Sequence, residues 1–374
     1  PFALFNYAQV LRTQDGAFAR HAIPDILKAA GRAIELTDPE QKSQRHIHLM
    51  CLEQIATCHY YERQFEKVVE ICDRALALKP DYLDPLMIRA NALFKLGRHD
   101  EARVAYEKYL EVQAAYDPGT ERDPIILTHI DARAAAYYGL AALANNEGDT
   151  TAAKDHYAAA LRAWDGFQDA YSRLGRLYFD EGDFAQARRH FLKQLETSFQ
   201  TMEALLGLAI VYKETKMPDN AEEYYRMAMK QDEFDPEPCA KYGRFLLEQK
   251  RVDEAIEVIQ QAIERDRDKG RAYLQASQLL SQFGHHGQAA TYLERLRAET
   301  GDDPDSLNDQ ANCHYQQKEF ESAARLYREA TRLPDAKPIT WRNLGLALYH
   351  LGQNGEAIES LEYYLKKSPD DLDI

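Results

Sequence analysis

The chain has 374 residues, of which 45% are hydrophobic and 29% are charged, so it has ample material for a buried core. Its formal net charge is −15 and its Lys and Arg residues are scattered, which argues against a nucleic-acid partner because a phosphate backbone would be repelled. No apolar stretch approaches the roughly 20 residues that a membrane span requires, and we expect no membrane span.

The N-terminal residues 1–48 predict an irregular first helical unit and a connector. Helices are expected at residues 2–13 and at about 24–36, joined by a longer loop through Gly16. The chain opens on Pro1, without Met, inside the first of these helices, and we expect a segment upstream of it. Residues 49–116 then predict two regular units, each made of two amphipathic helices.

The next segment, residues 117–133, is an insertion of about 17 residues relative to the repeat. Asp117-Pro118-Gly119 is typical of a turn, and Asp123-Pro124 is typical of a helix N-cap followed by Pro in the first turn. The apolar residues from Ile125 onward then extend the following helix backwards. Two interpretations stay open: a lengthened helix that packs its own apolar residues, or a loop that contacts a partner or a neighbouring domain.

Residues 134–371 predict seven contiguous units of 34 residues, and residues 372–374 form a tail. Each unit repeats three features: an anchor in the first helix, a small residue at the start of the second helix and a bulky residue four positions later. In six of these units the small residue is Ala153, Ala187, Ala221, Ala255, Ala289 and Ala323. Gly175, Gly243 and Gly345 provide similar clearance in first helices, because helices approach to about 8–10 Å only where the crossing residues are small.

This spacing resembles the tetratricopeptide repeat, with the motif residues Trp341, Leu344, Gly345, Ala357, Leu361 and Pro369 in the last unit. The resemblance covers nearly the whole chain. It implies an all-α, right-handed superhelical solenoid of about ten helical hairpins, with a concave groove lined by the first helix of each unit. It also implies that the ligand is a protein or a peptide segment held in that groove.

The resemblance places a set of first-helix side chains in the binding groove. Aromatic and apolar groups predominate in the first half, and amide and guanidinium groups, which can hold an extended backbone, predominate in the second half. The predicted groove residues are Met87, Asn91, Phe94, Tyr138, Arg176, Phe179, Lys213, Arg244, Asn308, Asn312, Tyr315, Arg342 and Tyr349. The Lys and Asn clamp that holds chaperone tails in some repeat domains is not present in three consecutive units.

The sequence indicates no catalytic residues, no cofactor and no metal site. Asp266-Arg267-Asp268 and Asp303-Pro304-Asp305 resemble the Asp-x-Asp of glycosyltransferases, but their position between hairpins favours helix capping. Cys51 and Cys58 could approach Cys72 on the paired helix, although their spacing favours small core residues over zinc ligands. The five irregularly spaced cysteines indicate reduced thiols and a cytoplasmic location.

Two functional interpretations stay open. The opening residues 1–7 and residues 109–138 resemble the repeat regions that follow the catalytic domain of some bacterial family 2 glycosyltransferases, which implies a non-catalytic arm that presents an acceptor protein to an upstream catalytic domain. The alternative is a free-standing adaptor that assembles a complex in secretion, envelope or appendage biogenesis. The last helix exposes Ile358, Leu361 and Leu365 in this register, which leaves three alternatives open: the protein continues, a partner packs there, or a second copy packs there and forms a homo-oligomer through the uncapped last unit.

Overall fold

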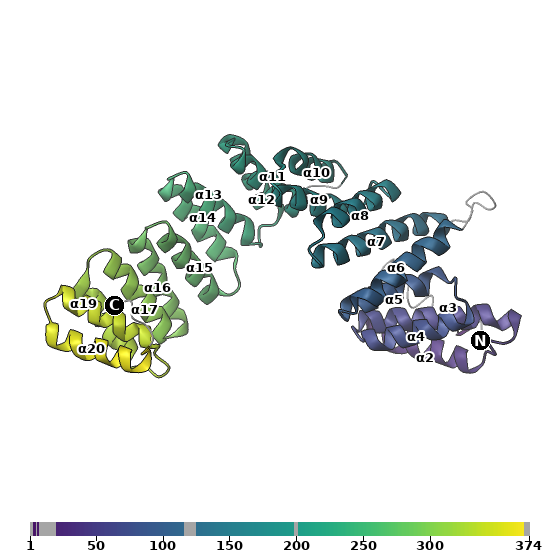
Figure 1. Ribbon diagram of the computed structural model, residues 1–374, viewed down its shortest axis with the longest axis horizontal. Helices are drawn as coiled ribbons and strands as arrows, with labels where there is room; N and C mark the ends of the chain where they lie inside the picture. The colour runs from purple at the N-terminus through teal and green to yellow at the C-terminus, as the bar shows by residue number, and fades with distance from the viewer. Residues whose placement is uncertain (1–2, 5, 7–19, 116–124, 198–200, 370–374) are drawn as a thin grey trace. The chain divides into compact units, whose positions relative to one another are not determined.

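The computed structural model describes residues 3–4, 6, 20–115, 125–197 and 201–369, with the backbone alone at residues 20 and 125–131. These residues are helices and their connections, without any strand, as the sequence predicted. The chain divides into two compact units, Pro1–Phe199 and Gln200–Ile374, which we call unit 1 and unit 2. Figure 1 shows that consecutive helices within each unit pack side by side as hairpins.

From residue 20 onward, unit 1 contains a single helical turn and a helix that packs on the first hairpin. Four hairpins follow, in which α3, α5, α7 and α9 are the first helices and α4, α6, α8 and α10 are the second helices. The bounds are η2 Arg20–Ala22, α2 Ile23–Glu35, α3 Lys42–Tyr61, α4 Phe65–Leu78, α5 Leu83–Lys95, α6 His99–Ala114, α7 Ile125–Asn146, α8 Thr150–Ala163, α9 Gln168–Asp180 and α10 Phe184–Thr197.

Unit 2 contains five hairpins in its described residues, with the odd-numbered helices from α11 to α19 as first helices. The bounds are α11 Met202–Glu214, α12 Pro218–Gln231, α13 Glu237–Glu248, α14 Val252–Arg265, α15 Lys269–Gln282, α16 His286–Thr300, α17 Pro304–Gln316, α18 Phe320–Thr331, α19 Pro338–His350 and α20 Asn354–Lys367. Each second helix also packs on the first helix of the next hairpin, so the apolar faces are covered by neighbours.

The helix boundaries agree with the periodicity and refine it at two places. Helix α2 lies where the second helix of the irregular unit was predicted, whereas α3 begins at Lys42, inside the expected connector. Helix α7 begins at Ile125, so the second part of the insertion lengthens a helix. The first predicted helix, at residues 2–13, and the predicted turn at residues 117–119 lie largely or wholly outside the described residues.

Small residues create the close approach between the two helices of a hairpin. A methyl group on Gly345 of α19 would lie 2.6 Å from Leu361 Cγ of α20, and one on Gly175 of α9 would lie 2.7 Å from Phe191 Cε1 of α10. The alanines that open the second helices are at most 3% exposed. The clearance predicted from the sequence is therefore confirmed, and a side chain at these glycines would force the helices apart.

The turn inside each hairpin uses one residue in the left-handed conformation. The residues with positive φ in these turns are spaced by 34 residues within each register: Arg63 and Gly97, and then Gly148, Gly182, Lys216, Lys250, Gly284, Lys318 and Gly352. The amide of this residue donates to a carbonyl near the end of the first helix, as from Gly182 N to Phe179 O at 2.9 Å. A left-handed residue after the last helical turn is a common way to satisfy these carbonyl groups.

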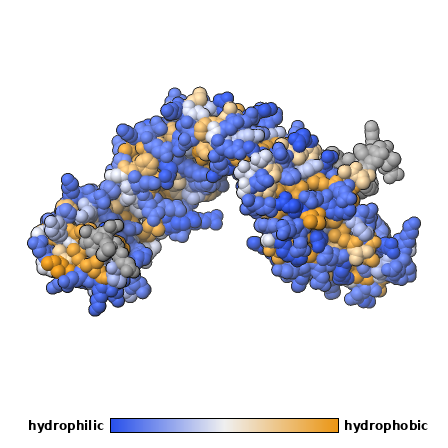
Figure 2. Space-filling view, viewed as in Figure 1, coloured by the Kyte–Doolittle hydropathy of each residue, from blue (hydrophilic) through white to orange (hydrophobic). Residues whose placement is uncertain are grey.

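The surface is mainly polar. Figure 2 shows that hydrophilic residues predominate on the viewed face, with patches of apolar residues among them. Among the described helices, none has the length and apolar character needed to cross a membrane. In α20, Ile358 is 56% exposed and Leu365 is 38% exposed, as the sequence predicted, whereas Leu361 is half-buried over Gly345.

Candidate protein-binding surface

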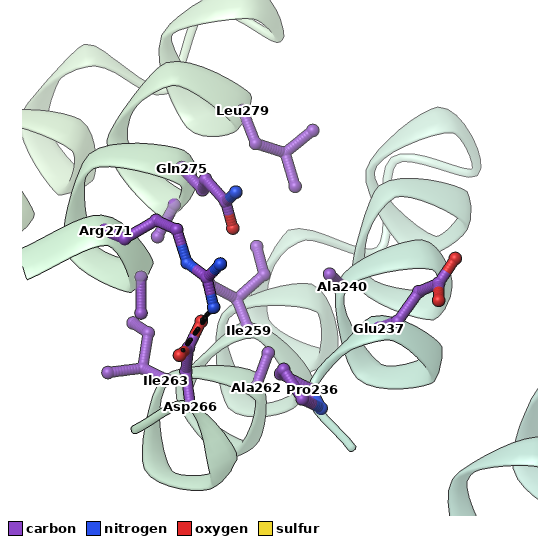
Figure 3. Close-up of a pocket in the computed structure, with 12 residues that line it drawn as sticks. Pro236, Glu237, Ala240, Ile259, Ala262, Ile263, Asp266, Arg271, Gln275 and Leu279 are labelled. Atoms are coloured by element: carbon purple, nitrogen blue, oxygen red, sulfur yellow. Dashed lines mark hydrogen bonds and ion pairs between the residues drawn. The ribbon is translucent and has the colours of Figure 1, made fainter. Parts of the chain in front are cut away.

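An apolar cavity of about 280 Å³ lies between consecutive hairpins of unit 2. Figure 3 shows its side chains converging from α13, α14 and α15. Its wall is mostly aliphatic, with Ile259 and Ile263 from α14 and Leu279 from α15. The complete lining is Pro236, Glu237, Ala240, Ile259, Ala262, Ile263, Asp266, Arg271, Ala272, Gln275, Ala276 and Leu279.

The cavity exists because two positions of the repeat carry alanine here. Ala240 occupies the position at which the preceding and following units carry Leu206 and Leu274. Ala276 occupies the position at which the preceding unit carries Tyr242. An open apolar pocket of this size at the surface is a candidate site for an apolar group of a ligand.

Charged pairs at the edge of the cavity are largely neutralised. Asp266 is buried, and both of its carboxylate oxygens accept hydrogen bonds from Arg271 Nη2 at 2.9 Å. Burial works against ionisation of Asp266, but the hydrogen bonds from the Asp268 amide and from Arg271 outweigh it and hold its pKa below the ordinary value. Glu237 pairs with Lys241 at 2.8 Å. The interior of the cavity is thus apolar, with donors and acceptors confined to its edge.

A second, polar cavity of about 290 Å³ lies one hairpin further along unit 2. It is lined by Ser277, Gln278, Ser281 and Gln282 of α15, by His286 and Leu293 of α16, and by Asp309, Asn312, Cys313 and Gln316 of α17. Burial raises the pKa of the Asp309 carboxyl above its ordinary value. The second cavity therefore has more side chains that can form hydrogen bonds, although apolar atoms make up most of the exposed lining of both cavities.

In unit 2, most predicted groove residues link neighbouring hairpins. Lys213 of α11 pairs with Glu248 of α13 at 3.3 Å, and Arg244 Nη1 donates to Gln282 Oε1 of α15 at 3.2 Å. At the other end of the unit, a hydrogen bond of 3.0 Å joins the hydroxyl of Tyr315 to His350 Nε2. These contacts form a polar ridge along the first helices, in which the side chains hold each other as well as facing solvent.

An amide cluster joins α17, α18 and α19. Asn343 Nδ2 donates to Asn308 Oδ1 and to Asn312 Oδ1, both at 3.2 Å, and the hydroxyl of Tyr327 donates to Asn312 Oδ1 at 2.6 Å. Arg342 of α19 is half-buried. Tyr349 is 65% exposed and makes an edge contact with His350.

In unit 1, the predicted residues fall into three environments. Met87 is buried in the core, so this residue is not available in a groove. Asn91, Phe94, Tyr138 and Phe179 are half-buried against neighbouring side chains, and Arg176 is exposed. The contacts are a hydrogen bond of 2.7 Å from Tyr106 Oη to Asn91 Oδ1, ring contacts of Phe94 with His99, Tyr138 with Tyr157 and Phe167, and Phe179 with Phe184, and an ion pair of Arg176 with Asp180.

The residues considered for chemistry have structural roles. Asp268 caps α15 by accepting from the Arg271 amide, and Asp303 caps α17 by accepting from the amides of Asp305 and Ser306, as predicted. All five cysteines are buried and none forms a disulfide in the structure. Cys51, Cys58 and Cys72 belong to separate core clusters, so they act as the small core residues that the spacing favoured.

A fold of stacked helical hairpins, with cavities and a polar ridge along its first helices, defines a helical-repeat binding scaffold. Family models described as tetratricopeptide repeat match residues 59–118, 172–236, 212–280, 246–313 and 310–374. Together these ranges cover more than half of the chain, and the protein belongs to the tetratricopeptide repeat family.

Curated relatives resemble parts of the chain. Type IV pilus assembly protein PilF of Pseudomonas aeruginosa is 29% identical over 168 residues, which are 44% of this chain and 66% of that protein. Protein CTR9 homolog of Arabidopsis thaliana is 24% identical over 303 residues, which are 74% of this chain and 25% of that protein. The chain thus spans less than two thirds of the length of either relative. A solved structure of Pseudomonas aeruginosa PilF, 24% identical, covers 55% of this chain and 93% of its own, with a TM-score of 0.36.

Proposed function

We propose that the protein is a scaffold that holds a peptide segment of a partner protein along the first helices of unit 2. The apolar cavity between α13, α14 and α15 carries this proposal, because it provides an anchor for one apolar side chain of the segment. An apolar cavity of about 150 Å³ is large enough to bind benzene. A cavity of about 280 Å³ therefore has room for a large aliphatic or aromatic side chain.

The groups beside the cavity supply the remaining interactions. Arg271 uses one guanidinium nitrogen for Asp266, and its other donors point to a role in binding main-chain carbonyl groups. The polar cavity lined by Gln278 and Asn312 offers amide groups to a side chain further along the segment. The predicted groove residues Arg244, Asn308, Tyr315 and Tyr349 then belong to the polar ridge that the segment follows.

The substitution Ala240→Leu tests the anchor. Ala240 is exposed beside the cavity, and leucine is the residue at this position in the adjacent units, so the variant is expected to fold. Peptides are selected on the full chain from a displayed random library, and their affinities are measured by fluorescence anisotropy. Selected peptides are expected to carry a large apolar residue and to bind the variant at least about tenfold more weakly.

The matched control is Ala298→Leu, which adds the same side chain at an exposed position of α16 outside the cavity. This control is expected to leave the affinity unchanged. Selection of no peptide, or equal affinity for wild type and Ala240→Leu, would refute the proposed anchor.

At the level of the whole protein, we favour the free-standing adaptor in secretion, envelope or appendage biogenesis. The similarity to a type IV pilus assembly protein over 168 residues supports this role. The alternative role, an arm of a glycosyltransferase, is supported by the resemblance of residues 1–7 and 109–138 to such arms. The gene sequence upstream of Pro1 distinguishes the two: an α/β domain with Asp-x-Asp at a strand end would favour the arm and overturn the adaptor.

Two further expectations stay proposals. The five buried cysteines, which form no disulfide in the structure, support a cytoplasmic location, which fractionation of the source cells tests. The exposed Ile358 and Leu365 support self-association through α20. Sedimentation is expected to show a concentration-dependent oligomer that is lost when both residues are replaced by glutamate, and a monomer at all concentrations would refute it.

A further inference from the structure

A third hollow, of about 810 Å³, lies between the second helices α12 and α14 of unit 2. Tyr242 and Leu246 of α13 are buried and form its floor. The hollow shares α13 and α14 with the apolar cavity, but the two share no lining residue. On α14, Val258 faces the hollow and Ile259 faces the cavity, so the two sites occupy different faces of the same helix. We call this hollow the second-helix groove.

An exposed aromatic side chain stands at the edge of the second-helix groove. Phe234, in the connection between α12 and α13, is 83% exposed and lines the groove with Met229 of α12. The equivalent position in the following units carries Asp268 and Asp302. A large aromatic residue in place of these acids exposes apolar surface to water, and it lies beside the buried apolar floor. The Phe234 ring and the buried floor together provide the kind of apolar contact area that protein interfaces use at their centre.

The charges of the groove are unbalanced toward the acidic side. Glu233, Glu257 and Glu264 line it, and no ion pair joins them to a basic side chain within the described part of the chain. Two of the basic side chains are already engaged: Arg226 pairs with Glu222 at 2.6 Å, and Arg265 Nη1 donates to Met229 O at 3.1 Å. Lys230 and Arg265 add positive charge to the lining without an ion pair among the described residues. The four glutamates of the lining outnumber its three basic side chains by one, so the groove favours a cationic partner over an anionic one.

We propose that the second-helix groove binds a basic amphipathic segment of a second protein, separate from the segment held along the first helices. Its apolar side chains pack on Phe234, Met229 and the floor of the groove. Its Lys or Arg side chains pair with Glu257 and Glu264 on α14. Since the two sites use opposite faces of α14, one copy of unit 2 binds two partners and brings them together.

The test uses the full chain and a displayed library of random peptides. Peptides that bind wild type are passed over the charge-reversed variant Glu257→Lys/Glu264→Lys, and those that no longer bind are kept. They are expected to carry Lys or Arg next to apolar residues. Their affinity is expected to fall at least about tenfold in the charge-reversed variant and in Phe234→Ala, and to weaken as salt is added.

Two controls separate this groove from the other site and from general charge. Glu294→Lys/Glu299→Lys makes the same charge change at exposed positions of α16 outside the groove and is expected to leave the affinity unchanged. Ala240→Leu is also expected to leave it unchanged, so failure of one site does not imply failure of the other. The proposal is overturned if no peptide depends on Glu257 and Glu264, if the dependent peptides are acidic, or if the α16 control weakens binding equally.

Discussion

The substitution Gly345→Ala tests the packing within a hairpin most directly. The added methyl group would lie 2.6 Å from Leu361 Cγ and 3.1 Å from Ala357 O, so α19 and α20 must move apart. Glycine to alanine within a helix ordinarily stabilises by about 0.5–1 kcal/mol, whereas overpacking costs about 1–3 kcal/mol. The net expectation is a loss of about 0.5–2 kcal/mol in the free energy of unfolding.

Gly355 in α20 provides the control within the same hairpin. A methyl group there meets no atom within 4 Å, so Gly355→Ala is expected to leave the stability unchanged or to raise it slightly. Trp341 stacks on Tyr363 with the ring centroids 4.5 Å apart, and Trp164 is the only other tryptophan. In a Trp164→Phe background, tryptophan fluorescence during urea denaturation reports on this hairpin. A midpoint for Gly345→Ala equal to or above that of Gly355→Ala would refute the packing argument.

Three further predictions follow from buried polar groups. Removal of the Tyr106 hydroxyl by Tyr106→Phe is expected to destabilise more than Tyr327→Phe in urea denaturation, by about 1 kcal/mol. Asn312 Oδ1 keeps a second donor after its tyrosine hydroxyl is removed, whereas Asn91 Oδ1 has none among the described residues; equal losses would contradict this. Burial lowers the pKa of His190 from 6.5 to about 4. Because this histidine binds a proton more tightly in the unfolded chain, the free energy of unfolding should fall as pH decreases from 6.5 to about 4, by no more than about 3 kcal/mol. The slope should become smaller in His190→Phe, with a remainder from His48 and His156, whose pKa values are also lowered by burial; an unchanged slope would contradict this assignment. All five cysteines are buried, so iodoacetamide is expected to leave them unmodified in the native protein and to modify all five after denaturation. Intact mass measures both results, and rapid labelling of the native protein would contradict the expectation.

The fold could be predicted from the sequence because each repeat is specified by residues that are close together in the sequence. The constant period, the small residues at Gly175, Gly243 and Gly345, and the capping Asp268 and Asp303 each act within one hairpin or at its junction with the next. Such short-range features can be recognised in the sequence of one unit, and their recurrence in the other units confirms the repeat.

The candidate sites were less predictable, for two physical reasons. The cavity beside Ala240 and Ala276 results from missing bulk, and its only signal is a departure from the residues at equivalent positions of adjacent units. The position of a residue in a helix also does not determine its environment. Met87 is buried in the core, whereas Lys213 and Arg244 form polar contacts with neighbouring helices. Direct comparison of equivalent positions in adjacent units would have found the cavity. It would not have found the burial of a single side chain, because that burial depends on packing across hairpins.

The left-handed residues of the hairpin turns have a practical consequence. Arg63, Lys216, Lys250 and Lys318 hold a conformation that side chains disfavour, whereas the other turns of this series use glycine. Replacing each by glycine should therefore strengthen its hairpin by up to about 1 kcal/mol. None of the four lines the apolar cavity, the polar cavity or the second-helix groove. These substitutions would therefore stabilise the protein away from the proposed binding sites. A background stabilised in this way would tolerate the destabilising substitutions that are needed to test those sites.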